Sequence, residues 1–327
     1  MNPTEYFAAS RLLIVAGKGG VGKTVVSAAL ARAAALAGRS ALIVEVEGKS
    51  GLPRMFGHPE LGYDELVLHK GGGPEGAADV TARTITPDAA LVDYLESHGL
   101  SRITKRLVSS GALDVVATAV PGIRDILVLG KVKQLQRSEA ADVVILDAPA
   151  AGHAISFLRS AKGIIDAVKV GPIHSQARDV LDLLEDHERC QVLLVTLPEE
   201  TPVNELIETA FSLEDEIGVG LGPTVVNGMY EEYDGLDVPA GEAAEAGGVS
   251  LLDGEADALD EAADFRRHRI ALQRAQVERL SEQLPLPQLR MPFLFESEIG
   301  PEEVDVLARC MLDAIGSLDA DLALGAS

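Results

Sequence analysis

Gly17-Lys18-Gly19-Gly20-Val21-Gly22-Lys23-Thr24 is the stretch that decides the fold of this 327-residue chain. It fits the pattern G-x-x-x-x-G-K-[ST], whose glycines let the backbone curl and point its N–H groups at phosphate oxygens. An apolar run over residues 11–16 precedes it, and an Ala-rich helical pattern over residues 24–36 follows it. A strand, a Gly-rich turn and a helix in this order predict a phosphate-binding loop rather than an ordinary turn.

This loop predicts a nucleotide site in which different residues have separate tasks. Lys23 is expected to reach the β- and γ-phosphates of ATP or ADP, and the Thr24 hydroxyl is expected to bind Mg²⁺. The helix that begins near Lys23 adds the positive end of its dipole. The loop residues predicted to bind the nucleotide are Gly17, Gly19, Gly20, Val21, Gly22, Lys23, Thr24 and Val25.

Lys18, a second lysine directly after the first glycine, makes the motif more specific. A lysine here defines the deviant Walker A ATPases, and the resemblance implies that Lys18 crosses a face-to-face dimer to the partner's nucleotide. It would act like an arginine finger delivered in trans, because it supplies positive charge where the transition state develops negative charge. A solvated loop lysine is the alternative for Lys18 taken alone.

Strand-like apolar runs recur along the rest of the chain, with helical patterns between them. The expected strands are residues 41–46, 142–146, 192–197, 223–226 and 288–293, with a hairpin formed by 66–69 and 80–84. This order predicts an α/β fold, with a mostly parallel central sheet flanked by helices.

Two acidic segments follow predicted strands, and they carry a resemblance to one ATPase family. The first reads EVEGKS over residues 45–50, and since residues two apart in a strand face the same side, Glu45 and Glu47 can point together. The segment resembles the ArsA and tail-anchored-protein targeting ATPase family, which has Asp-Pro-Ala after its second strand. The resemblance implies that Glu47 replaces the Asp that orients the attacking water, and an ordinary strand-end glutamate is the alternative.

The second segment reads DVVILDAPAAGHAISF over residues 142–157. A hydrophobic strand that ends in an aspartate is the Walker B pattern, and it predicts Asp147 near Mg²⁺, through water. The family continues with T-A-P-T-G-H, of which this chain keeps Gly152 and His153 and loses both threonines. These residues would belong to switch II, which reports the phosphate state to the dimer interface. A core or capping histidine is the alternative.

Further segments extend the resemblance over nearly the whole chain. Residues 120–125, VPGIRD, resemble the family's P-G-I-D-E segment between the two switches. Asn227 matches an asparagine that binds adenine, whose edge an amide can both donate to and accept from. Pro292 and Phe293 fall where a later loop of the family packs on the base.

The domain organisation predicted from these patterns is simple. Residues 1–317 form a single P-loop ATPase domain with a helical subregion at about 87–136, broken at Pro121-Gly122, and residues 318–327 form a flexible tail. Residues 239–264 are acidic and rich in Ala and Gly, and their first half is expected to be a loose surface loop. Helices are expected over residues 265–284 and 302–315.

Composition limits the partners and the compartment. A formal net charge of −23 disfavours binding to nucleic acid or to anionic lipid. No apolar stretch reaches the roughly 20 residues that span a bilayer, so direct membrane insertion is not expected. The chain starts without a signal-peptide core, and two lone cysteines, Cys190 and Cys310, fit a reducing cytoplasm.

The residues and the resemblance together imply a cytoplasmic ATPase that uses ATP, ADP and Mg²⁺. It would work as a homodimer, or as a heterodimer with a paralogous ATPase subunit, and couple hydrolysis to a transport or targeting partner such as a membrane protein. The pattern is most like the stand-alone bacterial members called anion-transporting ATPases. One alternative is a regulatory subunit that binds nucleotide and hydrolyses it weakly. Another is a MinD- or ParA-like positioning ATPase, although residues 318–327 contain no Lys or Arg for membrane binding.

Overall fold

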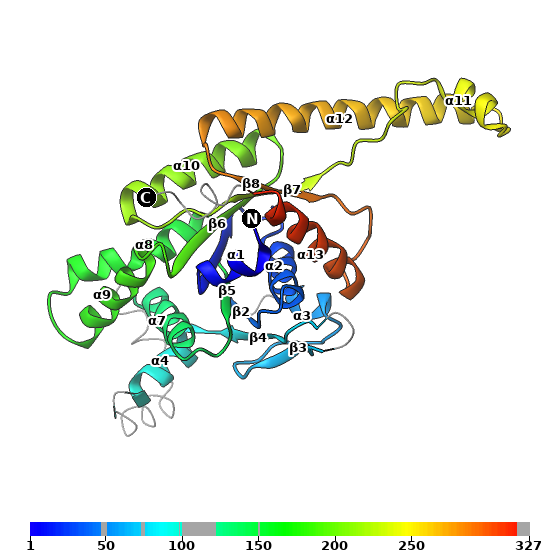
Figure 1. The fold of residues 1–327 in the computed structure, drawn as a ribbon. Helices are drawn as coiled ribbons and strands as arrows, with labels where there is room; N and C mark the ends of the chain where they lie inside the picture. Colours follow the sequence, from blue (N-terminus) through cyan, green and yellow to red (C-terminus); the bar gives the residue numbers. More distant parts are fainter. Residues whose placement is uncertain (47–50, 73–75, 98, 100–121, 150, 319–327) are drawn as a thin grey trace.

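A central sheet organises the molecule. The computed structural model describes residues 1–46, 51–72, 76–97, 99, 122–149 and 151–318. Within them, eight strands follow the order β3-β4-β2-β5-β1-β6-β7-β8 (Figure 1). Every neighbouring pair is parallel except β3–β4 at one edge. The predicted α/β fold with a mostly parallel sheet is confirmed, and so is the antiparallel pairing of the expected hairpin.

The elements alternate along the chain in the manner of parallel α/β proteins. The strands are β1 (Leu12–Gly17), β2 (Ala41–Val46), β3 (Leu66–His69), β4 (Val80–Ile85), β5 (Val143–Asp147), β6 (Cys190–Thr196), β7 (Thr224–Met229) and β8 (Gln288–Pro292). The helices are α1 (Pro3–Ala9), α2 (Lys23–Leu36), α3 (Gly51–Met55), α4 (Pro87–Ser97), α7 (Ile123–Arg137), α8 (Ala151–Ala167), α9 (Pro172–Leu184), α10 (Glu200–Ile217), α11 (Ala240–Gly247), α12 (Glu255–Gln283) and α13 (Pro301–Gly316).

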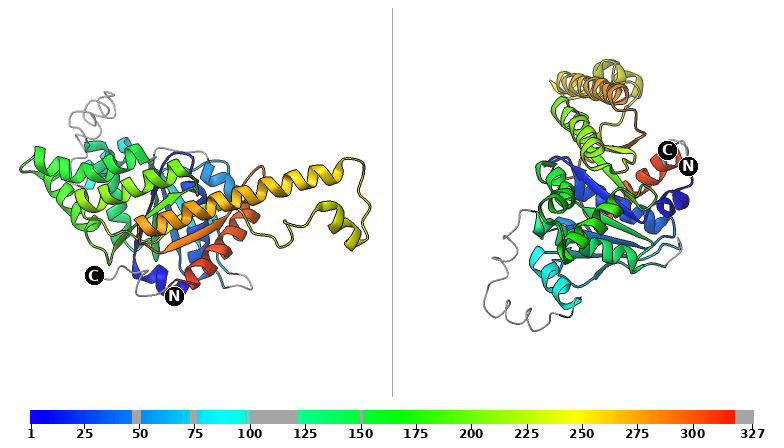
Figure 2. Two further views of the ribbon diagram at one scale, coloured as in Figure 1. Left: turned by 90° about the horizontal axis from the view of Figure 1, so that it is seen from above. Right: turned by 90° about the vertical axis from the view of Figure 1, so that its left-hand side faces the viewer.

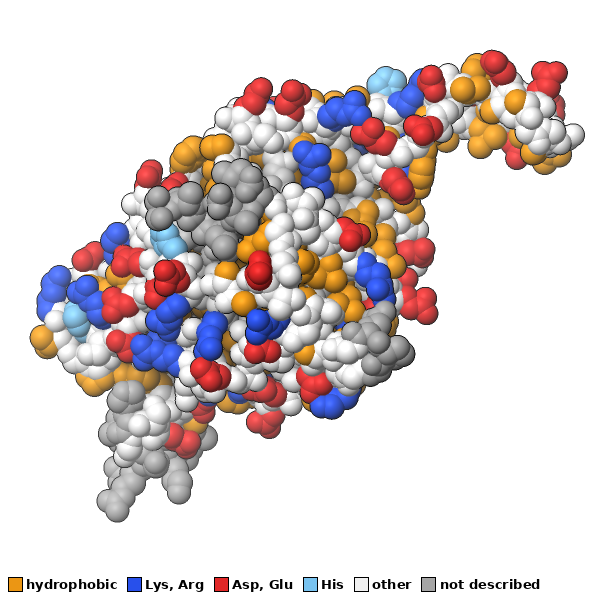
Figure 3. All heavy atoms as spheres, viewed as in Figure 1, with side chains coloured by type: hydrophobic (Ala, Val, Ile, Leu, Met, Phe, Trp, Pro, Cys, Tyr) orange, Lys and Arg blue, Asp and Glu red, His pale blue; other side chains and the backbone are white. Residues whose placement is uncertain are grey.

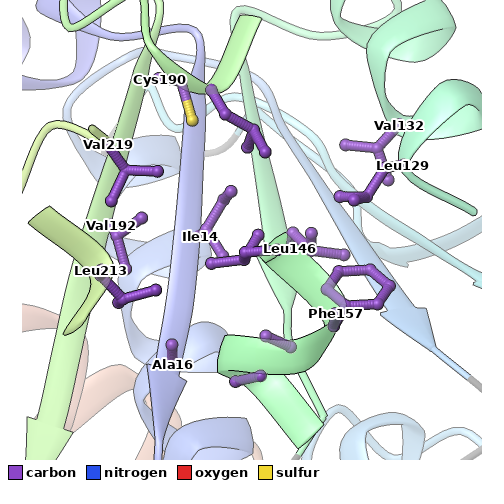
Figure 4. Packing of buried hydrophobic residues seen from close by; sticks show 14 of the residues in the cluster. Ile14, Ala16, Leu129, Val132, Leu146, Phe157, Cys190, Val192, Leu213 and Val219 are labelled. Atoms are coloured by element: carbon purple, nitrogen blue, oxygen red, sulfur yellow. The ribbon is translucent and has the colours of Figure 1, made fainter. Parts of the chain in front are cut away.

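Helices cover both faces of the sheet, and each face has its own apolar core (Figures 1 and 2). One core lies against α1, α2 and α13, and the other lies against α7, α8, α9 and α10. Because both faces are buried, the central strands are continuous apolar runs instead of alternating ones. Figure 4 shows the second core, where Ile14 and Leu146 of neighbouring strands lie close to Phe157 of α8. Full burial of each such side chain contributes about 1.5–3 kcal/mol.

Residues 239–264 depart from the prediction. The expected loose loop contains α11, and α12 begins at Glu255, ten residues before the expected start at residue 265. The prediction was wrong because α11 buries no residue and therefore shows no apolar stripe. The helix-forming signals are local instead: Ala and Glu have high helix propensity, and Glu255 and Asp257 occupy the first turn of α12.

Together α11, the residues that follow it and the first ten residues of α12 form a projection, here called the arm (residues 240–264). Figure 2 shows it extending well beyond the sheet and its covering helices. The arm contains eight acidic residues and no Lys, Arg or His. Figure 3 shows acidic and apolar side chains together on this projection. Val249 and Leu252, which lie between α11 and α12, are 61% and 79% exposed.

Some sequence predictions fall partly outside the described residues. In the expected helical subregion, α4 and α7 are helices, whereas residues 100–121 are not described. Most of the expected tail, residues 319–327, is not described either. The single domain over residues 1–317 stays a prediction. Of the helices that the structure describes, none combines the length and the apolar character needed to cross a membrane.

Candidate nucleotide-binding site

The predicted phosphate-binding loop joins the end of β1 to the start of α2. Gly22 is the N-cap of α2 and has φ +91°, a left-handed conformation that costs other residues about 1–2 kcal/mol. A Cβ atom at this position would also overlap the amide nitrogen of Asn227. Backbone strain and lack of space therefore both favour glycine at the point where the loop turns into the helix.

Lys23, the first residue of α2, is folded back over the loop. Its side chain is buried, with 7% of the residue exposed, and Nζ donates a hydrogen bond to the backbone oxygen of Lys18 at 2.9 Å. The N–H groups at the start of α2 have no partners within the helix, and they carry the positive end of its dipole. The loop thus combines backbone donors with a held ammonium group, as phosphate binding requires.

Thr24 and Asp147 meet beneath the loop. The Thr24 hydroxyl donates to Oδ2 of Asp147 at 2.7 Å, and Asp147 is fully buried at the end of β5. Asp147 lies beside Val15 of β1 in the parallel register, which places it under the loop that follows β1. A hydroxyl and a carboxylate are hard oxygen donors, so this pair fits Mg²⁺ chemically.

A second carboxylate lies in the same row of the sheet. Glu45 of β2 is the register neighbour of Asp147 on one side and of Thr84 of β4 on the other. Glu45 is 1% exposed, and its Oε2 accepts a hydrogen bond from the Thr84 hydroxyl at 3.0 Å. Glu47, predicted to orient the attacking water, lies outside the described residues.

Lys18 has a partner within its own chain. Its Nζ lies 2.5 Å from Oε1 of Glu205 on α10, and the two side chains are 49% and 29% exposed. A pair exposed to this extent contributes at most about 1 kcal/mol, because water and salt screen it. The contact therefore holds Lys18 weakly, and another anionic group can replace Glu205.

Asn227 is the predicted adenine contact, and here it touches the loop directly. Its Nδ2 donates to the backbone oxygen of Val21 at 2.9 Å. Phe293, predicted to pack on the base, follows β8 and is 44% exposed. Its ring lies 5.2 Å from the ring of Tyr230 and 4.8 Å from that of Phe295, so the three form an exposed aromatic cluster. Pro292, the other predicted base contact, is the last residue of β8.

The remaining predicted residues have the following places. Gly19 and Gly20 are exposed on the loop, and Val25 is partly buried against the core on the α2 side. Gly152 and His153 lie in the first turn of α8, and their side chains are not described. Of the segment between the switches, residues 122–125 are described and lead into α7.

Comparison with known proteins identifies the family. A family model described as anion-transporting ATPase matches residues 10–170. The ATPase BagA of Mycobacterium tuberculosis is 33% identical over 301 residues, which cover 86% of this chain and 87% of BagA. This chain belongs to the ArsA-type anion-transporting ATPase family. The ATPase get3 of Neurospora crassa is 26% identical over 209 residues, covering 63% of this chain and 58% of get3.

The match to the ArsA-type family model divides the site into two parts. The model covers the loop, Glu45, Thr84 and Asp147, which form the phosphate and metal end. Glu205 and Asn227, which contact the loop from α10 and β7, lie beyond residue 170. The match to BagA covers most of the chain, so it supports the family assignment outside the phosphate end as well.

The two cysteines of this ArsA-type protein cannot share a ligand. Cys190 belongs to the core on the α8 side of the sheet, whereas Cys310 packs against the core on the α2 side. Burial raises the pKa of the Cys190 thiol to about 12, and burial also raises the pKa of Cys310. Since the thiolate is the form that binds metals and metalloids, neither cysteine is prepared for that task.

Sequence reasoning missed two contacts of the site. Thr84 closes a predicted strand, but its bond to Glu45 depends on the order of strands in the sheet, which the sequence does not give. Glu205 lies in a helix far from the loop in sequence, and the pattern around it is that of an ordinary solvated helix face. If the order of the strands were known, Thr84 could be identified as a neighbour of Glu45, whereas no sequence signal points to Glu205.

Proposed function

We propose that this chain is a Mg²⁺-dependent ATPase whose ATP-bound state closes a dimer. The observation that supports it best is the combination of a buried Lys23 folded over its loop with the Thr24–Asp147 bond beneath it. These are the parts that bind a triphosphate and its metal in P-loop ATPases. The free thiols of Cys190 and Cys310 fit a protein that acts in the cytoplasm.

In the proposed reaction, the oxygen of a water molecule bonds to the γ-phosphorus of ATP. The bond from that phosphorus to the β–γ bridging oxygen breaks, which gives ADP, inorganic phosphate and a proton. Lys23 and the loop N–H groups would hold the phosphates, and Thr24, with Asp147 through water, would hold Mg²⁺, which would supply positive charge to the phosphate oxygens. Glu47 occupies the sequence position expected to orient the water.

Lys18 gives the proposed dimer its dependence on ATP. A lysine that leaves Glu205 and reaches the nucleotide of a partner subunit exchanges a weak surface contact for one with a polyphosphate. The exchange favours the closed dimer only when nucleotide is bound, as a two-state switch requires. The partner is a second copy or a paralogous subunit, and the motion would be coupled to a transport or targeting partner such as a membrane protein.

A second candidate function is that of a regulatory subunit with weak hydrolysis of its own. It is favoured by two departures from the family's motifs: Glu47 stands where the family has Asp, and both threonines are absent from residues 148–153. In a heterodimer, a paralogous subunit would then supply the more active site. Tight binding of ATP with negligible turnover, restored by addition of the paralogue, would support this function.

The experiment that tests the proposal measures binding, turnover and mass of the purified chain under the same conditions. With Mg²⁺ we expect ATP turnover and, by light scattering, a larger dimer fraction with a non-hydrolysable ATP analogue than with ADP. With EDTA, turnover should stop. A chain that binds no nucleotide would exclude both candidate functions, whereas binding with an unchanged mass would exclude only the ATP-gated dimer.

A further inference from the structure

We propose that Glu45 is a further residue of the magnesium site, where its carboxylate binds water molecules of the Mg²⁺ held by Thr24 and Asp147. Thr84 acts as a positioning residue, because its hydroxyl holds the Glu45 carboxylate. The inference rests on the proposed function, since it needs a nucleotide–metal complex at this loop. It goes beyond that function by assigning metal binding to a residue that the sequence motifs leave without a role.

The direction of the side chains supports this assignment. Side chains alternate along a strand, and Ile43 and Ile145 belong to the core on the α2 side. Glu45 and Asp147, two residues later on β2 and β5, therefore face α2 as well. Thr24 lies in the first turn of α2 and bonds to Asp147, so Glu45 points toward the face on which the predicted metal ligands meet.

The register brings the two carboxylates together. Glu45 and Asp147 are direct neighbours on adjacent parallel strands, which lie about 4.8 Å apart. Both residues are almost completely buried, at 1% and 0% exposure. Thr84 stands on the other side of Glu45 in the same row. Two acids thus share one buried row at the carboxyl end of the sheet, with Thr84 beside Glu45 in the row and Thr24 of α2 bonded to Asp147.

The chemistry of this row suits a hydrated divalent cation. Two adjacent buried carboxylates repel each other when both are ionised, and a divalent cation beside them offsets this repulsion. Mg²⁺ usually keeps several waters and takes one or two carboxylates, so a second carboxylate can bind through its waters.

The test uses Mn²⁺ as the probe, followed by electron paramagnetic resonance, with ADP as the nucleotide. The variant Glu45→Gln keeps the shape and the acceptor for Thr84. We expect it to weaken Mn²⁺ binding to the ADP complex by about tenfold or more, the usual effect of losing a group that orients a metal's ligands. ADP affinity in EDTA should stay unchanged. The control is Glu65→Gln, which removes a carboxylate paired with Arg83 at 3.7 Å.

A second pair of variants keeps the test decisive if Glu45→Gln does not fold. Thr84→Val leaves Glu45 in place without its hydroxyl partner, and we expect a smaller loss of Mn²⁺ affinity, about three- to fivefold. Thr81→Val makes the same change on the opposite face of β4 and should have no effect. Unchanged Mn²⁺ affinity in Glu45→Gln, or in Thr84→Val where the former is unfolded, overturns the inference. Absence of ADP binding by the wild-type chain would instead overturn the proposed function.

Discussion

The loop end of the sheet and the arm are opposites in how the chain holds them. At the loop end, Lys23, Asp147 and Glu45 are buried charged residues with their side chains directed by neighbouring strands and helices. In the arm, α11 buries no residue, and the buried residues of α12 are Gln273, Val277 and Leu280, all in its second half. The residues of the loop end are therefore held by contacts with several neighbouring elements, whereas the arm extends into solvent.

The change from buried to exposed structure takes place where α12 meets the end of β7. Gln273 accepts a hydrogen bond from the backbone of Tyr230 at 2.8 Å and donates one to Gly228 at 3.0 Å. It thereby fastens α12 to the end of β7, directly after Asn227, which contacts the phosphate-binding loop. Gln273 and Asn227 therefore link α12, through β7, to the phosphate-binding loop.

The largest effect is expected from Lys23→Ala at the loop end. Removal of the ammonium group takes away charge that should act on the β- and γ-phosphates, so ATP turnover should fall by about 100-fold or more. Steady-state phosphate release measures it. The control is Arg267→Ala, which removes a cation of α12 that is paired with Asp264 and should leave turnover unchanged. Equal turnover in wild type and Lys23→Ala would assign the hydrolysis to another site.

Two leucines of α12 allow the two regions to be compared by what they contribute to the free energy of unfolding. Leu280 is fully buried, whereas Leu259 in the arm is 46% exposed. Leu280→Ala leaves a cavity in the core and should lower the free energy of unfolding by about 2–5 kcal/mol. Leu259→Ala keeps the helix propensity and should change it by less than about 0.5 kcal/mol. Urea unfolding measures both variants, and similar losses would mean that the arm packs against something in solution.

The same contrast explains what the sequence could predict. The central strands were predictable because burial on both faces leaves apolar runs such as residues 41–46, and the loop was predictable because phosphate binding demands glycines at fixed spacing. The start of α12 was not, because no apolar stripe marks an exposed helix. Contacts between distant segments, such as Lys18 with Glu205, depend on the folded arrangement of the elements, and residue patterns do not encode it.

Alanine substitutions at two glycines of the loop distinguish the cost of backbone strain from the cost of steric overlap. Gly20 and Gly22 have nearly equal φ angles, +86° and +91°, but an added Cβ meets nothing at Gly20 and the Asn227 amide at Gly22. Gly20→Ala should therefore cost about 1 kcal/mol of unfolding free energy. Gly22→Ala should cost about 1 kcal/mol more, because Asn227 loses its bond to Val21.

The double variant Gly22→Ala with Asn227→Ala checks this reason. Without the Asn227 amide, the extra cost of Gly22→Ala over Gly20→Ala should disappear, a coupling that a double-mutant cycle in urea measures directly. Additive losses would mean that the two residues do not interact, and the link between β7 and the loop would have to be abandoned.

The smallest effect is expected from Glu205→Gln, which changes only the charge that faces Lys18. If Lys18 acts on the nucleotide of a partner subunit, Glu205 competes with that nucleotide for the lysine. An exposed pair of this kind can weaken dimer formation by at most about 1 kcal/mol, which is about fivefold in the equilibrium constant. The concentration of non-hydrolysable ATP analogue at half-maximal dimer formation should fall two- to fivefold.

Glu216→Gln is the matched control, because Glu216 lies on the same helix and pairs with Arg159 instead. Salt should reduce the difference between the two variants, since it screens the same pair in wild type. A Glu205→Gln variant that forms dimers less readily than wild type would show that this glutamate supports the active arrangement of Lys18, and competition would then be the wrong description.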